Sequence, residues 1–340
     1  MTEVNGWGIA LVLIGGIFNG SFILPMKRIT AWPWENIWLC YSLGGMVIFP
    51  LGLAIATVPH LGEVYRNTPG SVLAEVALFG LGWGIGSTLF GLGVNRVGMA
   101  LGYALVLGIT ASFGSLLPLI LLHPEKLLTR RGHTLMIGTA LVVVGLSCLA
   151  IAGRRREYEM KVATSAIASS SFTLGLVVCI FSGLFSSMLN FSFLFGRDLQ
   201  RLASYFGSSP ARAANSIWCV ALSSGLIANA GYCVYLLRKN RTWHLFWKRG
   251  TFICWMGAVV MAVIWFGGIV AYGIGAASLG VLGGIVGWPL LMAMTVLAGN
   301  SWGAAMGEWR AARRGALSYW SGGLIALLLA IYVISLGGTT

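Results

Sequence analysis

The sequence has little charge and very few acidic residues. Only 9% of its 340 residues are charged, with nine carboxylates against 22 lysines and arginines, while apolar residues make up 57%. A soluble globular domain carries roughly a quarter charged residues, so this composition excludes an ordinary soluble protein. The net charge of +13 does not point to nucleic acid, because the basic residues lie between apolar blocks instead of clustering on one stripe. Such placement is typical of loops at a membrane surface.

Catalytic and metal-binding motifs are also missing. The sequence contains no GxSxG, no HExxH and no phosphate-binding loop that ends in Lys-Ser or Lys-Thr. The six cysteines fall inside apolar runs with no CxxC spacing, and the four histidines lie in loops or at helix ends. We therefore expect no metal, no cofactor and no enzyme activity. The missing phosphate-binding loop also argues against direct use of ATP.

Long apolar runs dominate the rest of the chain. A helix needs about 20 apolar residues to cross a bilayer, and each crossing segment must be helical because backbone polar groups find no partner in lipid. The sequence predicts an all-α integral membrane protein with ten transmembrane helices, at Gly6–Pro25, Asn36–Val58, Val72–Val94, Met99–Leu122, Thr134–Ile151, Thr173–Phe195, Ala213–Leu237, Phe252–Gly275, Gly280–Ala298 and Ser318–Leu336.

The distribution of basic residues predicts the orientation. The odd-numbered loops hold fifteen lysines and arginines and the even-numbered loops seven, which places the odd loops in the cytoplasm and both termini outside. The longest loop, residues 153–172, contains three consecutive arginines at 154–156 and is predicted to be a cytoplasmic linker. It would join an N-terminal five-helix repeat, residues 1–152, to a C-terminal one, residues 173–340.

The two halves of the chain resemble each other. A shift of 182 residues places Trp83 on Trp265 and Gly86 on Gly268, and it also matches four further glycines, Gly91, Gly93, Gly98 and Gly102, with Gly273, Gly275, Gly280 and Gly284. A shift of 167 places residues 16–18 on residues 183–185. Because five helices is an odd number, the halves must have opposite orientations. Such inverted repeats support alternating access around a site near the midplane.

Polar and aromatic groups inside the spans are candidates for binding a neutral sugar, which is recognised through hydrogen bonds and stacking without formal charge. Any single Trp can also serve packing, but an unpaired amide in hydrocarbon is costly. The predicted substrate-binding residues are Asn19, Trp83, Tyr103, Asn190, Trp265, Tyr272 and Trp288.

Two carboxylates near the spans are candidates for a gate or for proton coupling, since ionisable groups at membrane depth are costly. Glu35 follows Pro33 in a predicted first helical turn, where it either complements the helix dipole or is protonated in a transport cycle, with Lys27 as a changing partner. Glu308 precedes Trp309 and Arg310, and a salt bridge is favoured there over a proton role.

A resemblance to a known family rests on one segment above all. Residues 22–38, FILPMKRITAWPWENIW, match the pattern F-x-x-P-x-K-[KR]-x-x-x-W-x-W-E-x-x-W. Further matches lie at residues 79–86, 98–102 and 108–110 and at the predicted binding residues of the second half. The chain resembles the L-rhamnose–proton symporters of the drug/metabolite transporter superfamily along almost its whole length.

The resemblance implies uptake of L-rhamnose or a related monosaccharide by proton symport, through two inverted five-helix repeats in the bacterial inner membrane. The protein would be a monomer. This chain departs from the family pattern at Gly268 and Gly284, where the pattern has polar residues. The alternatives are a drug/metabolite-type exporter of a small metabolite and, from other classes, a membrane enzyme or a scaffold.

Overall fold

The computed structural model describes residues 6–159 and 169–338, and ten helical spans in them are long and apolar enough to cross a membrane. All ten predicted spans are confirmed. Seven consist mainly of one long helix: α1 (Gly6–Ser21), α5 (Gly70–Val97), α6 (Met99–Leu122), α7 (Arg130–Glu159), α13 (Phe252–Ser278), α14 (Gly283–Ala305) and α15 (Arg314–Gly338).

The other three spans are interrupted. Span two joins α2 (Trp34–Leu43), a π-helical turn (Gly44–Ile48) and α3 (Phe49–Thr57); span six joins α8 (Ser169–Ser186), α9 (Met188–Phe195) and α10 (Arg197–Tyr205); and span seven joins α11 (Pro210–Ala213) and α12 (Asn215–Lys239). The π turn precedes Pro50, which has no N–H for the regular helical ladder. A short helix, α4 (Leu61–Asn67), and 3-10 turns at Leu24–Arg28, Pro124–Lys126, Trp243–Trp247 and Gly280–Leu282 fill the connections.

Several helices extend beyond their predicted ends. Helix α7 continues to Glu159 and α8 begins at Ser169, so part of the predicted linker 153–172 is helical, and its residues 160–168 lie outside the described residues. Helix α10 likewise extends span six past Phe195. Hydropathy marks only the hydrocarbon core, whereas arginine and glutamate are good helix formers outside it.

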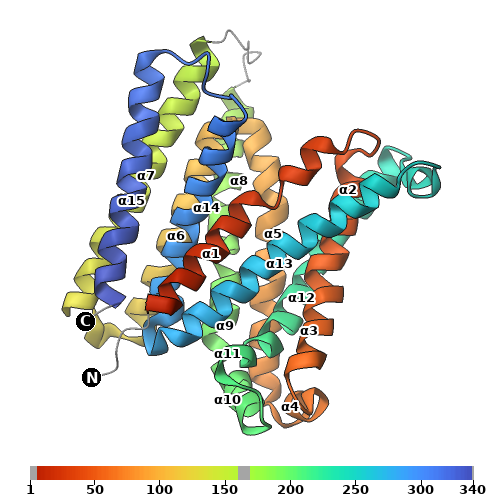
Figure 1. The fold of residues 1–340 in the computed structure, drawn as a ribbon, viewed down its shortest axis with the longest axis vertical. Helices are drawn as coiled ribbons and strands as arrows, with labels where there is room; N and C mark the ends of the chain where they lie inside the picture. Colours follow the sequence, from red (N-terminus) through yellow and green to blue (C-terminus); the bar gives the residue numbers. More distant parts are fainter. Residues whose placement is uncertain (1–5, 160–168, 339–340) are drawn as a thin grey trace.

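Helix partners repeat between the two halves (Figure 1). In the first set, α1 packs against α13 and α14; in the second, α8 packs against α5 and α6. If each span is matched with the span five places later, the α5–α12 contact corresponds to the α13–α2 contact. The α6–α7 contact corresponds in the same way to the α14–α15 contact. Helices α7 and α15 pair with each other at one edge of the molecule. Both termini lie at the same end.

Glycines bring the backbones of these helices into direct contact. A Cβ added to Gly268 of α13 would meet the Gly15 carbonyl oxygen at 2.9 Å and Cβ of Phe18 at 3.1 Å. At the corresponding contact between α5 and α8, a Cβ on Gly86 would meet the Ser186 nitrogen at 2.6 Å and Cβ of Phe185 at 2.9 Å. Phe18 and Phe185 are 167 residues apart, and Gly86 and Gly268 are 182 apart. The contact of Gly86 with Phe185 therefore corresponds to the contact of Gly268 with Phe18, as the two sequence shifts require.

The α7–α15 pair has the same internal correspondence. A Cβ on Gly145 would meet Cγ of Leu327 at 2.9 Å, and a Cβ on Gly323 would meet Cγ of Leu149 at 2.8 Å. Each helix therefore presents a Gly-x-x-x-Leu face to the other, as small residues do at close helix crossings in membranes. The residues correspond by a shift of 178.

Two tight turns also correspond. Gly98, between α5 and α6, has φ of 90°, and Gly280, after α13, has φ of 76°. Both values lie in the left-handed region that glycine adopts without steric cost. This conformation explains the glycine at each of these short connections.

Substitution of Gly84 tests the backbone contact between α5 and α12. A methyl group there would fall on the Gly225 carbonyl, whereas one on Gly91 of the same helix would meet nothing within 4 Å. We expect Gly84→Ala to destabilise the protein by about 1–3 kcal/mol, the usual cost of overpacking. Thermal unfolding in detergent measures this. Gly91→Ala is the control, and equal melting temperatures for the two variants would contradict the assigned contact.

Candidate functional site

A buried hydrogen-bond cluster centred on Asn190 lies where α6, α9, α13 and α14 meet. The Asn190 side chain is fully buried. Its amide nitrogen donates to the carbonyl oxygens of Gly114, at 2.8 Å, and Gly284, at 3.0 Å. The hydroxyl of Tyr272 donates to the Asn190 amide oxygen. One amide thereby links three other helices.

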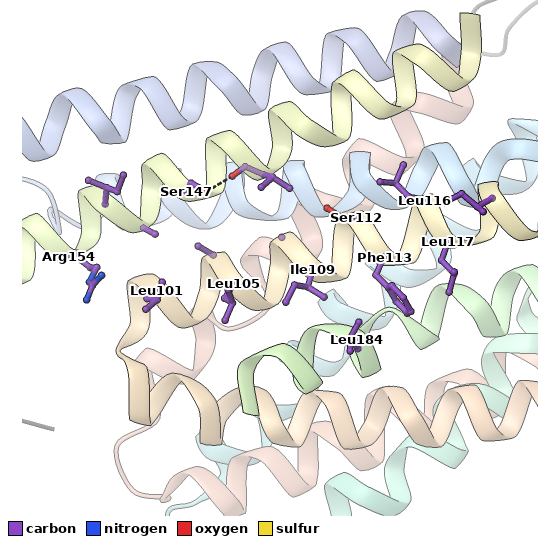
Figure 2. Close-up of a pocket in the computed structure, with 16 residues that line it drawn as sticks. Leu101, Leu105, Ile109, Ser112, Phe113, Leu116, Leu117, Ser147, Arg154 and Leu184 are labelled. Atoms are coloured by element: carbon purple, nitrogen blue, oxygen red, sulfur yellow. Dashed lines mark hydrogen bonds between the residues drawn. The ribbon is translucent and has the colours of Figure 1, made fainter. Parts of the chain in front are cut away.

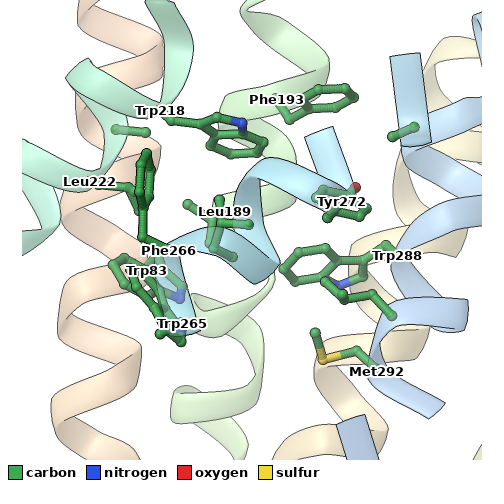
Figure 3. Close-up of a cluster of buried hydrophobic side chains, with 14 of the residues drawn as sticks. Trp83, Leu189, Phe193, Trp218, Leu222, Trp265, Phe266, Tyr272, Trp288 and Met292 are labelled. Carbon is green, nitrogen blue, oxygen red and sulfur yellow. The ribbon is translucent and has the colours of Figure 1, made fainter. Parts of the chain in front are cut away.

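Trp288 extends this cluster toward α6 (Figure 3). Its indole N–H donates to the carbonyl oxygen of Thr110 at 3.0 Å, and its ring lies edge-on to Tyr272 with centroids 5.6 Å apart. The Ser187 hydroxyl lies 3.2 Å from the same Thr110 oxygen. The structure therefore brings three predicted binding residues, Asn190, Tyr272 and Trp288, into direct contact.

Trp83 and Trp265 form a second aromatic group. Their rings stack with centroids 5.5 Å apart and an interplanar angle of 16°. Trp265 also meets Tyr41 edge-on at 5.8 Å. Trp83 and Trp265 are the pair related by the 182-residue shift, so each of these residues packs against its own counterpart.

Two predicted binding residues lie outside these groups. Tyr103 is 40% exposed and packs edge-on against Phe90, with centroids 4.7 Å apart. Asn19 is half-buried, and its side chain makes no hydrogen bond within the described part of the chain. Its backbone nitrogen borders Gly268, where a Cβ would come within 3.4 Å.

Gly268 and Gly284 lie at close contacts that leave no free room for a side chain. The Gly284 carbonyl accepts the Asn190 bond, and a Cβ on Gly284 would meet Cδ2 of Leu194 at 2.7 Å. Gly268 abuts the backbone of Gly15. A polar side chain at Gly268 would require the backbone of α1 to shift, whereas one at Gly284 would displace the side chains of Leu194 and Phe193.

Glu35 lies in the first turn of α2 and is only 4% exposed. Its carboxylate accepts hydrogen bonds from the Asn240 amide at 2.8 Å and the Thr242 hydroxyl at 3.1 Å. Among the described residues, no cation forms an ion pair with it. The carboxylate therefore joins the start of α2 to the loop after α12.

The structure does not place Lys27 beside Glu35. Lys27 instead donates to Glu308 at 3.1 Å, and Arg156 lies 3.6 Å from the other Glu308 oxygen. The Arg156 guanidinium also lies over the Trp309 ring at 4.8 Å. We call Lys27, Arg156 and Glu308 the Glu308 cluster; it joins the ends of α1, α7 and α14. The salt bridge predicted for Glu308 is thus present, with Lys27 as a partner that the sequence had assigned to Glu35.

Asn229 of α12 was not among the predicted site residues. It is buried, accepts from the Trp38 indole at 3.2 Å and donates to the Ser87 hydroxyl at 2.9 Å. The signal was present in the sequence, because Asn229 is an amide inside an apolar span just as Asn190 is. It lies beside Gly84 and Gly225, whose carbonyls are 3.3 Å from its amide nitrogen.

Comparison with known proteins gives a consistent result. The model of a family described as L-rhamnose-proton symport protein (RhaT) matches residues 1–340. A protein of Klebsiella pneumoniae (strain 342) named L-rhamnose-proton symporter is 28% identical over 352 residues, covering 99% of both chains. Proteins with the same name from Cronobacter sakazakii and Escherichia coli (strain ATCC 8739) are 28% and 27% identical, covering 100% and 99% of both chains.

The Glu308 cluster can be tested by neutralising its carboxylate. Glu308→Gln should cost no more than about 1 kcal/mol of stability, because the ion pairs are half-exposed. It should nevertheless speed maleimide labelling of a single cysteine at position 21, since Ser21 contacts Trp302 between the ends of α1 and α14. Asp198→Asn, which removes the Asp198–Arg201 pair, is the matched control. Equal labelling rates in both variants would refute a closing role for the cluster.

Proposed function

Because the chain belongs to the L-rhamnose-proton symport protein family, we propose that it imports L-rhamnose or a related monosaccharide by proton symport. The family match over all 340 residues carries this proposal. Ten apolar helices and a family of transporters make the protein a multi-pass membrane protein and a transporter, not an enzyme.

The proposed sugar site lies between the Asn190 cluster and the Trp83–Trp265 stack, where buried side chains such as Leu189 would have to move to admit a sugar. Asn190 supplies donors and an acceptor, and the indoles of Trp83, Trp265 and Trp288 supply flat faces for the apolar side of a sugar ring. In the present conformation the Asn190 donors are satisfied by carbonyls of Gly114 and Gly284. Sugar hydroxyls would replace those partners, so that no buried amide stays unpaired during the exchange.

Three further predicted binding residues, Tyr272, Asn19 and Tyr103, would act around this site. Tyr272 would orient the Asn190 amide through its hydroxyl. The Asn19 side chain, which has no hydrogen-bond partner among the described residues, would reach the sugar from α1. Tyr103 packs against Phe90, so it would have to move to reach the sugar.

The transport cycle is proposed to be alternating access by two inverted five-helix repeats, residues 1–152 and 173–340, joined by the linker 153–172. The matched contacts Gly86–Phe185 and Gly268–Phe18 support this, as does the mirrored Gly145–Gly323 crossing. Inverted repeats exchange inward- and outward-facing states by rocking one bundle against the other. In this arrangement the Trp83–Trp265 stack lies on the axis that relates the halves.

Glu35 is the proposed proton carrier. It is a buried carboxylate with no cationic partner among the described residues, and such a group is by default a functional candidate at membrane depth. A shift of 180, which also matches Trp38 with Trp218 and Gly45 with Gly225, places the neutral Asn215 at the equivalent position. Only the first half could then bind a proton there. Lys27, which pairs with Glu308, would regulate opening of the site at the end of the molecule where the Glu308 cluster lies.

The proposed setting is a bacterial inner membrane, with a monomer whose odd-numbered loops face the cytoplasm and whose termini face the periplasm. The excess of lysine and arginine in the odd-numbered loops supports this orientation.

Uptake of labelled L-rhamnose into proteoliposomes tests the proposal. We expect saturable uptake that an inward proton gradient accelerates, and a loss of that acceleration in Glu35→Gln. Gradient-independent uptake would refute proton coupling alone. No uptake of any monosaccharide, or net efflux of another metabolite, would refute the whole proposal.

The sugar contacts can be tested by removing one amide or one aromatic face. Asn190→Ala and Trp265→Ala should each lower uptake at limiting sugar by about tenfold, which corresponds to roughly 1.4 kcal/mol of lost binding. Trp247→Ala is the control, since Trp247 is 78% exposed and lies outside the spans. Protein in the membrane is quantified for each variant. Normal uptake by both test variants would show that the site lies elsewhere.

A further inference from the structure

A groove runs along one flank of the molecule, between α6, α7 and α8 (Figure 2). Its volume is about 740 Å³. Small residues on facing helices hollow it out: Gly108 and Ser112 on α6, and Ser147 and Ala150 on α7. Rim residues such as Ile120, which is 51% exposed, face the outside of the helix bundle. Since α6 and α7 both cross the membrane, the groove opens toward lipid.

The groove is apolar along its length and positive at one end. Leucine, isoleucine and phenylalanine line its walls, whereas Arg154 lies at the end nearest the loop after α7. Arg154 is exposed and makes no hydrogen bond or ion pair within the described residues. Arg155 beside it lies over the Tyr319 ring at 4.4 Å, and both arginines line a second hollow that adjoins the groove. The guanidinium groups therefore lie at the boundary of the apolar span.

We propose that this groove binds one anionic phospholipid, with an acyl chain along α6 and the phosphate held by Arg154 and Arg155. The lining of α6 extends from Leu101 to Ile120, which is about 28 Å at 1.5 Å per residue and close to the ~30 Å hydrocarbon thickness. A hydrocarbon chain fits that shape, and a water-soluble ligand does not. Guanidinium groups bind phosphate through paired N–H donors, and basic residues at a membrane surface attract anionic lipid.

The residues that form the groove are not repeated in the second half of the chain. If the halves correspond as proposed, Gly108 and Ser112 match Leu290 and Met294 by the shift of 182, while Ser147 and Ala150 match Ile325 and Leu328 by the shift of 178. Large apolar side chains thus occupy the equivalent places in the second half. Arg154 matches Tyr332 in the same way. Neither the small residues that hollow out the groove nor the charge of Arg154 recurs at the equivalent positions of the second half.

The proposed lipid would contact the same helix that supports the Asn190 cluster. Groove residues Gly108 and Ser112 alternate along α6 with Thr110 and Gly114, whose carbonyls accept from Trp288 and Asn190. A bound chain therefore braces α6 from its outer side. The lipid site itself does not depend on which solute the protein carries.

Native mass spectrometry of the purified protein tests this site, with phosphatidylglycerol and phosphatidylcholine of identical acyl chains as probes. We expect a phosphatidylglycerol adduct that survives gas-phase activation better than the phosphatidylcholine adduct. The double variant Arg154→Gln/Arg155→Gln should weaken phosphatidylglycerol binding at least fivefold, to the level of phosphatidylcholine. Ser147→Trp should fill the groove and weaken binding of both lipids. Arg249→Gln, which neutralises an exposed arginine in another loop on the same side, should change neither.

Several results would overturn the proposal. Unchanged phosphatidylglycerol binding in the double variant would do so, as would an equal loss in Arg249→Gln, which would indicate a general effect of surface charge. Displacement by glycerol 3-phosphate as effective as by the lipid would indicate an anion site without a chain. A dimer abolished by Ser147→Trp would assign the groove to a second copy of the protein. Should Ser147→Trp fail to fold, the exposed arginines still decide the outcome.

Discussion

Close contact between helix backbones at glycine is the constraint on which the rest of the structure depends. Helices in a bilayer gain little from burying apolar surface against one another, so they associate through short-range packing. Gly268 against Gly15 and Gly86 against Ser186 provide such packing between the two halves. These contacts fix α13 against α1 and α5 against α8. The main-chain carbonyls around Asn190 can be reached only because the helices lie this close together.

The centre of the protein shows how polar side chains are accommodated without charge. Asn190 and Trp288 use main-chain carbonyls of neighbouring helices as partners, and Asn229 of α12 does the same with the Gly84 carbonyl of α5. An amide left unpaired in this environment would be costly. Each such bond also ties two helices together, so substrate groups that compete for the same partners would loosen the packing between helices at the proposed site.

The number of spans and the buried amide of Asn190 could be read from the sequence, whereas the partner that Lys27 has in this structure could not. Hydropathy gives ten spans because the hydrocarbon core sets their length, and the cost of buried amides identifies Asn190. Lys27 was predicted as a changing partner of Glu35, which lies near it along the chain, and in this structure it pairs with Glu308, 281 positions away. Sequence distance carries no information about which helix ends meet. Tyr103 illustrates the same limit, since position in a span does not tell which side of the helix faces the centre.

The stack of Trp83 on Trp265 has a further consequence if the halves are related by a two-fold axis. A residue on such an axis meets its own counterpart, as in the isologous interface of a symmetric dimer. A ligand against this pair would encounter the same surface from either side of the membrane, so the pair itself cannot give transport a direction. The bias must come from features that lack a counterpart: Glu35, which corresponds to Asn215, and the ion pairs of Glu308. Vectorial transport in this protein would then be a property of its departures from symmetry.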